Sequence, residues 1–300
     1  MDWTTTAILS AAVLGVVNIL DSHLINHRLP GLRAFLFPVS LFYLVYAVPI
    51  FLLYPLPASV SGEVILVALL SGILRAAAVI LTMSQLLKGE VSQVIPVVYT
   101  SPIFVAVLAV LFLGERISAL HWLAIILVVV GAVLVNQGRA PVGLTRRSYA
   151  MLPPLVAASL LFALADITSK YVLQYISFWH NFYLSAFCLA GAALAISVRP
   201  RVLRSLWEIP DRNATLGLLA VNEALAPFGV LLAFWAIEHG PVSLVSTITA
   251  SRPVFVVIYS LVLGRFLPDI LAWFSSNRNL WLRLGASLLI FSGIALIYLT

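Results

Sequence analysis

Residues 89–115 read GEVSQVIPVVYTSPIFVAVLAVLFLGE, and residues 240–265 repeat this pattern as GPVSLVSTITASRPVFVVIYSLVLGR. The two copies lie about 151 residues apart, and a glycine, a serine and a proline recur at the same places in both. The segments that follow also match, since Gly131 corresponds to Gly293. Two unrelated apolar segments are not expected to share these residues in register. The sequence therefore predicts an internal duplication.

The composition identifies the environment of the chain. Of its 300 residues, 62% are apolar and only 9% are charged, whereas a soluble domain carries about 25% charged residues. So little charge excludes an ordinary soluble enzyme, a disordered chain and a secreted disulfide scaffold. Cys188 is the single cysteine, so no intrachain disulfide can form. The net charge of +6 does not indicate a nucleic-acid partner, because the basic residues lie in short breaks between apolar runs and form no continuous patch.

Ten apolar runs are interpreted as membrane-spanning helices, for which about 20 residues are needed. Helices are predicted rather than a β-barrel, because the runs are continuously apolar and lack the strict alternation of barrel strands. The expected spans are Thr6–Leu24, Ala34–Leu53, Val64–Leu86, Val91–Leu113, Trp122–Val135, Ala150–Val172, Trp179–Val198, Thr215–Ile237, Val242–Leu263 and Trp281–Leu299. The fifth of these is the shortest.

Each copy of the duplication contains five expected helices. Because five is odd, the second copy enters the membrane in the opposite sense to the first. This predicts an all-α integral membrane protein with ten transmembrane helices in a 5+5 inverted repeat around a central cavity. Residues 1–138 form the first repeat, 139–148 a linker and 149–300 the second repeat. Inverted repeats recur in secondary transporters, whose substrate sites lie near the midplane between the repeats.

The stretch from Ala78 to Gln137 resembles the EamA domain of the drug/metabolite transporter superfamily. It contains a turn with glycine, a serine, a proline within a helix, a Leu-Gly-Glu ending and a closing helix with a glycine. Ala236–Leu299 is similar to the second EamA copy of such proteins. The resemblance implies ten helices around a central cavity and a carrier for small metabolites such as amino acids, nucleotide sugars, drugs or lipid-linked sugars. Two features depart from the pattern: Arg265 replaces the usual Glu, and the long break at 264–280 is typical of an interfacial amphipathic segment.

Several polar and ionisable residues lie within the expected spans. A charge at that depth costs at least about 2.5–3.5 kcal/mol and is a functional candidate by default. The candidate substrate-binding residues are Asn18, Asp21, Arg75, Tyr99, Asp166, Lys170, Asn222, Glu223 and Arg252. The charged members are three acids and three bases, so they can neutralise one another in an empty cavity.

Structural roles remain open for some of these candidates. Asp166 and Lys170 lie one helical turn apart and could form only a local ion pair. Asp21 lies near a span end and could face lipid headgroups. Arg252 could bind backbone carbonyls that the following proline leaves free, and Tyr99 could either line the cavity or pack in the core.

We predict a secondary active transporter or exchanger of a small polar or zwitterionic metabolite, amino-acid-like or similar, that works by alternating access. Arg75 or Arg252 would bind a carboxylate or phosphate. Asp21, Asp166 or Glu223 would bind an amine or carry a coupling proton. The alternative is a flippase for a lipid-linked sugar or phospholipid. A non-transporting scaffold or receptor is disfavoured, because it has no reason to sustain six charges within the membrane.

The sequence predicts neither enzymatic activity nor ATP hydrolysis, because it lacks the hydrolase and phosphate-binding signatures. Transport is therefore expected to use a gradient or exchange. No cofactor is expected, and no metal site, because His23, His27 and His180 have no further ligand at suitable spacing and depth. The expected partners are a small-molecule substrate and membrane lipids, and the chain is expected to act as a monomer.

The distribution of Lys and Arg predicts the orientation of the chain. The odd-numbered breaks between spans hold 13 basic residues, and the even-numbered breaks hold only Arg116. Cytoplasmic loops carry the excess of Lys and Arg, so both termini are expected outside. Members of the resembled superfamily usually keep both termini in the cytoplasm. Either orientation makes the chain a multi-pass protein of a plasma or bacterial inner membrane.

Overall fold

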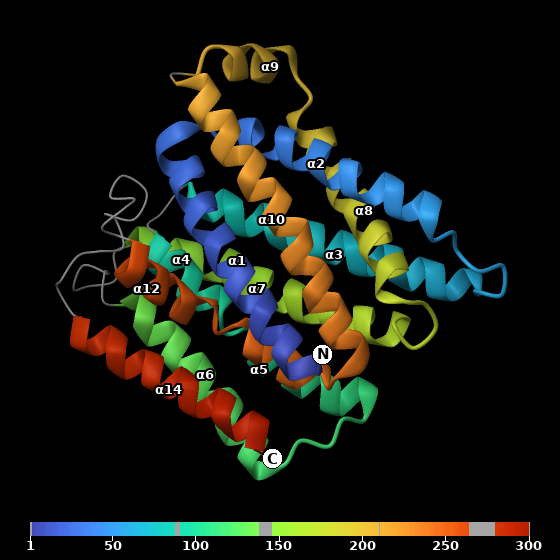
Figure 1. Cartoon of the computed structure of the whole chain (residues 1–300), viewed down its shortest axis with the longest axis vertical. Helices are drawn as coiled ribbons and strands as arrows, with labels where there is room; N and C mark the ends of the chain where they lie inside the picture. Colours follow the sequence, from blue (N-terminus) through green and yellow to red (C-terminus); the bar gives the residue numbers. More distant parts are fainter. Residues whose placement is uncertain (1, 88–90, 138–145, 210, 264–279, 300) are drawn as a thin grey trace.

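The computed structural model describes residues 2–87, 91–137, 146–209, 211–263 and 280–299, and these residues contain helices but no strand (Figure 1). The helices are α1 (Trp3–His23), α2 (Leu32–Leu53), α3 (Gly62–Leu86), α4 (Val91–Val98), α5 (Ser101–Leu108), α6 (Ala119–Gln137), α7 (Arg146–Val172), α8 (Phe178–Ser197), α9 (Pro200–Trp207), α10 (Arg212–His239), α11 (Val242–Thr249), α12 (Arg252–Leu263) and α14 (Leu280–Leu299). Two π-helical turns, η1 (Leu24–Arg28) and η2 (Ala109–Leu113), extend α1 and α5. The expectations for Arg265, for the amphipathic segment and for most of the linker fall outside the described residues.

Nine helical segments of the described residues are long and apolar enough to cross a membrane. They are Trp3–Arg28, Leu32–Leu53, Gly62–Leu86, Val94–Leu113, Ala150–Val172, Phe178–Ser197, Arg212–His239, Val242–Val262 and Trp281–Leu299. The expected fifth span corresponds to α6, whose apolar part, Ala119–Val135, is shorter. The chain is a multi-pass membrane protein whose described residues form helices only, and nine of their segments reach spanning length where the sequence predicts ten.

The expected spans 91–113 and 242–263 are each broken in the middle. The chain leaves α4 at Tyr99–Thr100 before α5 begins, and it leaves α11 at Ala250–Ser251 before α12 begins. A proline is the second residue of both α5 and α12. Since proline has no N–H and its ring clashes with the preceding turn, a continuous helix is unfavourable at these points. Each of these spans is therefore built from two shorter helices.

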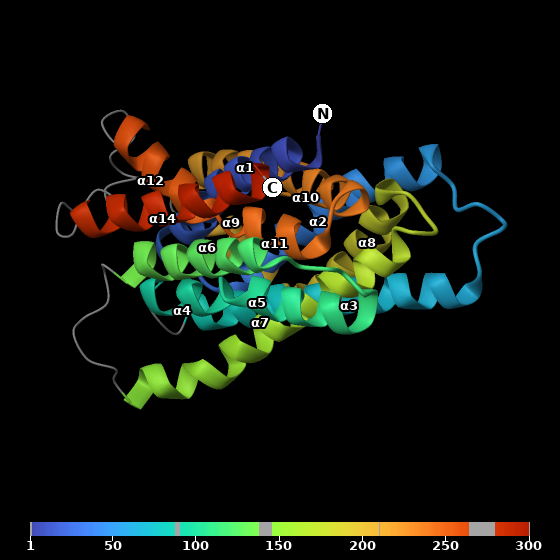
Figure 2. The same ribbon diagram turned by 90° about the horizontal axis from the view of Figure 1, so that it is seen from below.

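Helices that are distant in the sequence pack in pairs (Figure 1 and Figure 2). α1 packs along α10, α3 along α7, α2 along α8 and α6 along α14. The last pair meets at glycines: a Cβ on Gly131 would lie 2.6 Å from Cγ1 of Ile290, and a Cβ on Gly293 would lie 2.6 Å from Cγ2 of Val128. Gly131 and Gly293 correspond in the sequence repeat, so each copy supplies the same close contact to the other.

Large apolar side chains cover the outer surface of the helices. Leu52, Leu53, Leu66 and Phe112 are each 68–74% exposed. A water-soluble monomer rarely exposes so many large apolar groups. Hydrocarbon is the solvent that such a surface requires.

A short helix, α9, lies at the upper end of the molecule in Figure 1, where the sequence predicts only a polar break. Val202 is buried against the bundle, whereas Arg204 and Trp207 are exposed. Both termini are marked in the lower half of the same view. The arginines of α9 therefore lie at the end of the molecule opposite the termini.

Candidate functional site

A cavity lies between helices of the two halves of the chain. It consists of two adjoining chambers of about 210 and 120 Å³. Among the residues that line both chambers are Arg75, Tyr99, Phe162, Phe234 and Arg252. The larger chamber is lined from α1, α2, α3, α4, α7, α8, α10 and α12. Most of its lining is apolar, with a few polar and charged side chains between, which is the usual composition of a small-molecule site.

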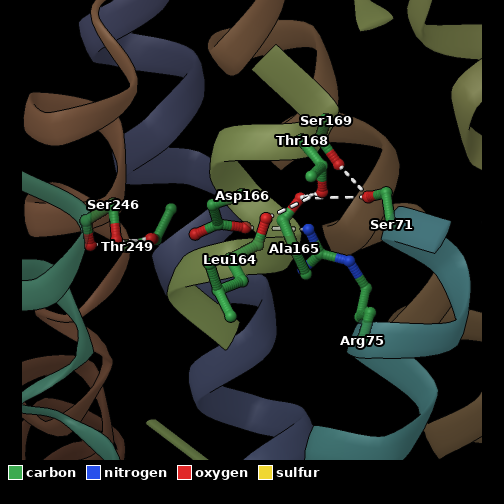
Figure 3. Close-up of polar contacts among 9 residues, drawn as sticks. All are labelled: Ser71, Arg75, Leu164, Ala165, Asp166, Thr168, Ser169, Ser246 and Thr249. Carbon is green, nitrogen blue, oxygen red and sulfur yellow. Dashed lines mark hydrogen bonds and ion pairs between the residues drawn. The ribbon is translucent and has the colours of Figure 1, made fainter. Parts of the chain in front are cut away.

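Arg75 of α3 is held on the cavity wall by an ion pair and an aromatic contact. Its Nη2 atom lies 2.8 Å from Oδ1 of Asp166 in α7. One turn earlier in α3, the hydroxyl of Ser71 lies 2.7 Å from that of Ser169, so a polar seam joins α3 and α7 (Figure 3). The guanidinium also lies 4.8 Å from the ring centroid of Phe234. The positive charge of Arg75 is therefore balanced by Asp166 within the protein.

Arg252 lines both chambers without such a partner. It forms no ion pair and no hydrogen bond with any residue that the structure describes, and its Nε is buried and unsatisfied. The backbone carbonyls before Pro253 therefore do not bind this guanidinium, because the side chain is directed to the cavity. Its positive charge remains available to a ligand.

α1 brings two polar side chains to the larger chamber. Asn18 donates a hydrogen bond from Nδ2 to the hydroxyl of Tyr99 at 2.7 Å, which holds the tyrosine at the break between α4 and α5. Asp21 lines the chamber as well, and its Oδ1 accepts a hydrogen bond of 2.8 Å from Asn222 of α10. Asp21 and Tyr99 thus both contribute to the cavity wall.

Asn222 and Glu223 are buried behind Asp21, with exposures of 0% and 1%. Asn222 Nδ2 donates to Oε1 of Glu223 at 2.9 Å, in addition to its bond to Asp21. Neither residue contributes to the lining of the two chambers. Glu223 is therefore linked to the cavity through Asp21 rather than facing it beside Arg75 and Arg252.

Lys170 does not reach the cavity and does not pair with Asp166. Its Nζ donates to the carbonyls of Ile237 and Gly240, at 2.7 and 2.8 Å, where α10 ends. A cation is favourable at a helix C-terminus, because the last carbonyls have no intrahelical donor. Lys170 thus closes the end of a helix, and Asp166 forms its ion pair with Arg75.

Several residues that shape this region are not among the candidates predicted from the sequence. Tyr43, Phe162 and Phe234 line the larger chamber, and nothing in the sequence distinguishes them from the other aromatic residues of the spans. Glu115 accepts hydrogen bonds from the beginning of α11, including one of 2.6 Å from the hydroxyl of Ser243. The Leu-Gly-Glu ending of the first repeat was a signal for Glu115, but it does not identify the partner.

Comparison with known proteins finds a family similar to the N-terminal part of the chain. Residues 2–137 match the EamA-like transporter family. An uncharacterized transporter in the cobO 3′ region of a Sinorhizobium species is 32% identical over 78 residues, which cover 26% of this chain and 55% of that relative. A solved crystal structure of another protein is similar with a TM-score of 0.70 and 19% identity, covering 99% of this chain and 95% of the other, which shows a shared fold. The N-terminal part of this chain is thus similar to the EamA-like transporter family, and the matched segment spans about half the length of the Sinorhizobium relative.

Proposed function

We propose that this protein is a secondary active transporter or exchanger of a small polar or zwitterionic metabolite, and that it works by alternating access. The proposal rests above all on Arg252, a guanidinium that lines the cavity without a counter-ion among the described residues. Arg252 is only partly exposed, and a charge that loses part of its hydration without gaining a counter-ion is unfavourable. A carboxylate or phosphate entering from outside relieves this cost and forms charge-assisted hydrogen bonds.

The cavity also suits the other end of a zwitterion. Asp21 lines the larger chamber and has no basic partner among the described residues, so its carboxylate is available to an amine. Arg75 and Asp166 neutralise each other and supply a polar but uncharged wall. The two chambers together lie at the lower end of the usual range of about 300–1,000 Å³ for ligand sites. This size favours a small metabolite over a lipid-linked sugar.

The helix pairs support alternating access. In a 5+5 repeat, α1 is equivalent to α7, α2 to α8, α3 to α10 and α6 to α14. Exchanging equivalent helices turns the contact α1–α10 into the contact α7–α3, and both contacts are present. The same exchange leaves the contacts α2–α8 and α6–α14 unchanged. This correspondence supports the 5+5 inverted repeat, with α6 as the fifth helix of the first half. In such an arrangement the two sides of the cavity can open in turn while the site stays fixed. We assign the two broken spans, α4–α5 and α11–α12, as the elements that rearrange.

Counterflow into liposomes tests the proposal. Vesicles with the purified protein are loaded with one unlabelled amino acid, nucleotide or phosphorylated metabolite at a time, and uptake of the labelled compound is measured. Arg252→Gln should abolish uptake of the compound that wild type carries. Arg204→Gln, on the exposed side of α9, is the matched control and should transport normally. Normal counterflow by a correctly folded Arg252→Gln protein would overturn the proposal.

The same vesicles distinguish a metabolite carrier from a lipid flippase. A fluorescent phospholipid in the inner leaflet is protected from a membrane-impermeant quencher unless the protein moves it outward. We expect no acceleration of quenching by the protein. Rapid quenching without metabolite counterflow would assign the flippase function instead.

The proposed orientation places both termini outside the cell. The exposed arginines of α9 lie at the end of the molecule opposite the termini (Figure 1). The cytoplasmic side of a membrane protein carries the excess of Lys and Arg in short loops. This favours a cytoplasmic α9, although the resembled superfamily usually has cytoplasmic termini.

A further inference from the structure

A polar cluster behind the cavity contains more hydrogen-bond acceptors than donors. Asp21 and Glu223 bind the same amide nitrogen of Asn222, at 2.8 and 2.9 Å. Their two bonded oxygens therefore lie within about 6 Å of each other, a separation at which two negative charges repel strongly inside a protein. Neither carboxylate has a basic partner among the residues that the structure describes.

The side-chain amide of Asn222 also has an acceptor without a donor. Oδ1 of Asn222 is buried and has no hydrogen-bond partner, and the residue as a whole is 0% exposed. It belongs to the carboxamide that binds both carboxylates, so it lies at the same cluster. Buried acceptors are normally satisfied, so an orphaned one is a place where a ligand, an ion or a water molecule can bind. The two carboxylates thus each accept one hydrogen bond from the amide nitrogen of Asn222, and the amide oxygen accepts none.

No arginine or lysine among the described residues forms an ion pair with either acid. The titratable and charged groups on the helices around them are His23 of α1, Tyr43 and Tyr46 of α2, Arg75 of α3, Tyr99 at the α4–α5 break and Arg252 of α12. Arg75 is bound to Asp166. The hydroxyl of Tyr46 donates to the backbone carbonyl of Ala224, at 3.0 Å, and not to a carboxylate.

We propose that Asp21, Asn222 and Glu223 form a binding site for one positive charge, separate from the anion site at Arg252. A proton, a sodium ion and the ammonium group of a substrate share the required chemistry, since each supplies positive charge to oxygen acceptors. Asp21 lies in the wall of the larger chamber, so a ligand can reach the site from there. Glu223 lies behind Asp21 and is shielded from water. In the transport cycle, on which this role rests, the site binds either the coupling ion or the amine of the substrate.

Binding to the purified full-length chain tests the site without transport. The midpoint of thermal unfolding is measured while NaCl or methylammonium chloride replaces tetramethylammonium chloride at constant ionic strength. Tetramethylammonium carries the same charge but has no N–H group to donate. In a third arm, infrared difference spectra record whether a carboxyl group takes up a proton when the pH is lowered. We expect a saturable rise of the midpoint with one cation, or a protonated carboxyl band.

Two isosteric variants attribute the response to the site. Glu223→Gln and Asp21→Asn should each abolish it. Glu223→Gln introduces an amide donor where the cation is missing, so we expect its unfolding midpoint without cation to be at least that of wild type. Glu208→Gln removes an exposed carboxylate beside α9 and should leave the response unchanged.

The outcomes identify the ligand or overturn the site. A response to methylammonium alone identifies the amine of a substrate, a response to NaCl identifies a sodium site, and a carboxyl band lost in Glu223→Gln identifies a proton site. No response in any arm, or a response that survives both variants, overturns the proposal. None of these measurements depends on uptake. The proposal of a cation site can therefore be overturned while counterflow still depends on Arg252, and the cation site can be confirmed when counterflow is absent.

Discussion

The carboxylate of Glu115 accepts two hydrogen bonds from Ser243, one from its hydroxyl at 2.6 Å and one from its backbone N–H at 3.4 Å. Its other oxygen accepts the N–H of Val242 at 2.8 Å. These groups begin α11, where the N–H groups have no intrahelical acceptor and the helix dipole favours an anion. Lys170 binds the last carbonyls of α10 on the other side of the same turn. Opposite charges from two other parts of the chain thus hold the turn between α10 and α11.

Glu115→Ala should lower the free energy of unfolding by about 1–3 kcal/mol, because it leaves buried N–H groups of α11 without an acceptor. Glu115→Gln keeps an acceptor and should cost less. Thermal unfolding in detergent measures both. Glu208→Ala is the control, since its exposed ion pair with Arg204 should contribute less than about 1 kcal/mol. Equal losses at the two positions would contradict a specific role for the Glu115 contact.

Arg75 and Asp166 should behave as a coupled pair. Removal of one partner from a buried ion pair typically costs about 3–5 kcal/mol, because a charge is left without its counter-ion. We expect less here, since the side chains remain 19% and 16% exposed. The double variant Arg75→Gln/Asp166→Asn should recover part of the stability that either single variant loses. Unfolding midpoints of the four proteins complete the cycle, and strictly additive losses would exclude the coupling.

Gly293→Ala should destabilise the contact between α6 and α14. The added methyl group would lie 2.6 Å from Cγ2 of Val128 and 2.8 Å from the carbonyl oxygen of Ala124, so the helices must separate. Overpacking of this kind costs about 1–3 kcal/mol. Gly285→Ala, on the same helix with no atom within 4 Å of the new methyl group, is the matched control and should be neutral or stabilising. A similar unfolding midpoint for both variants would argue against this packing.

Cysteine labelling decides the orientation. In a Cys188→Ala background, Asp2→Cys and Thr300→Cys should react with a membrane-impermeant thiol reagent in intact cells, because the basic end of the molecule is expected in the cytoplasm. Arg204→Cys, on the exposed side of α9, should react only after lysis. The reverse pattern would establish the cytoplasmic termini that are usual in the superfamily.

Sequence patterns alone predict the helical, membrane-embedded class of the protein and its similarity to the EamA-like transporter family. Long apolar runs specify helices, because lipid offers no hydrogen-bond partner to an open backbone. The duplication also predicts equivalent roles for Gly131 and Gly293, and both glycines lie at the α6–α14 contact. These features can be predicted from the sequence because they depend on the residue types of one short segment or on the comparison of two segments. The breaks within α4–α5 and α11–α12 were less readable, since proline is tolerated within many membrane helices.

Which charges meet depends on the packing of the helices and cannot be predicted from their spacing. Asp166 and Lys170 lie one turn apart on α7, yet Asp166 pairs with Arg75 on another helix and Lys170 binds the end of α10. An i,i+4 pair contributes only about 0.2–0.5 kcal/mol, so contacts across packed helices, where the dielectric is low, outweigh it. In the same way, no spacing in the sequence shows that Asn222 joins Asp21 to Glu223. The rotation of each helix about its axis, which selects these partners, is set by packing against all of its neighbours at once.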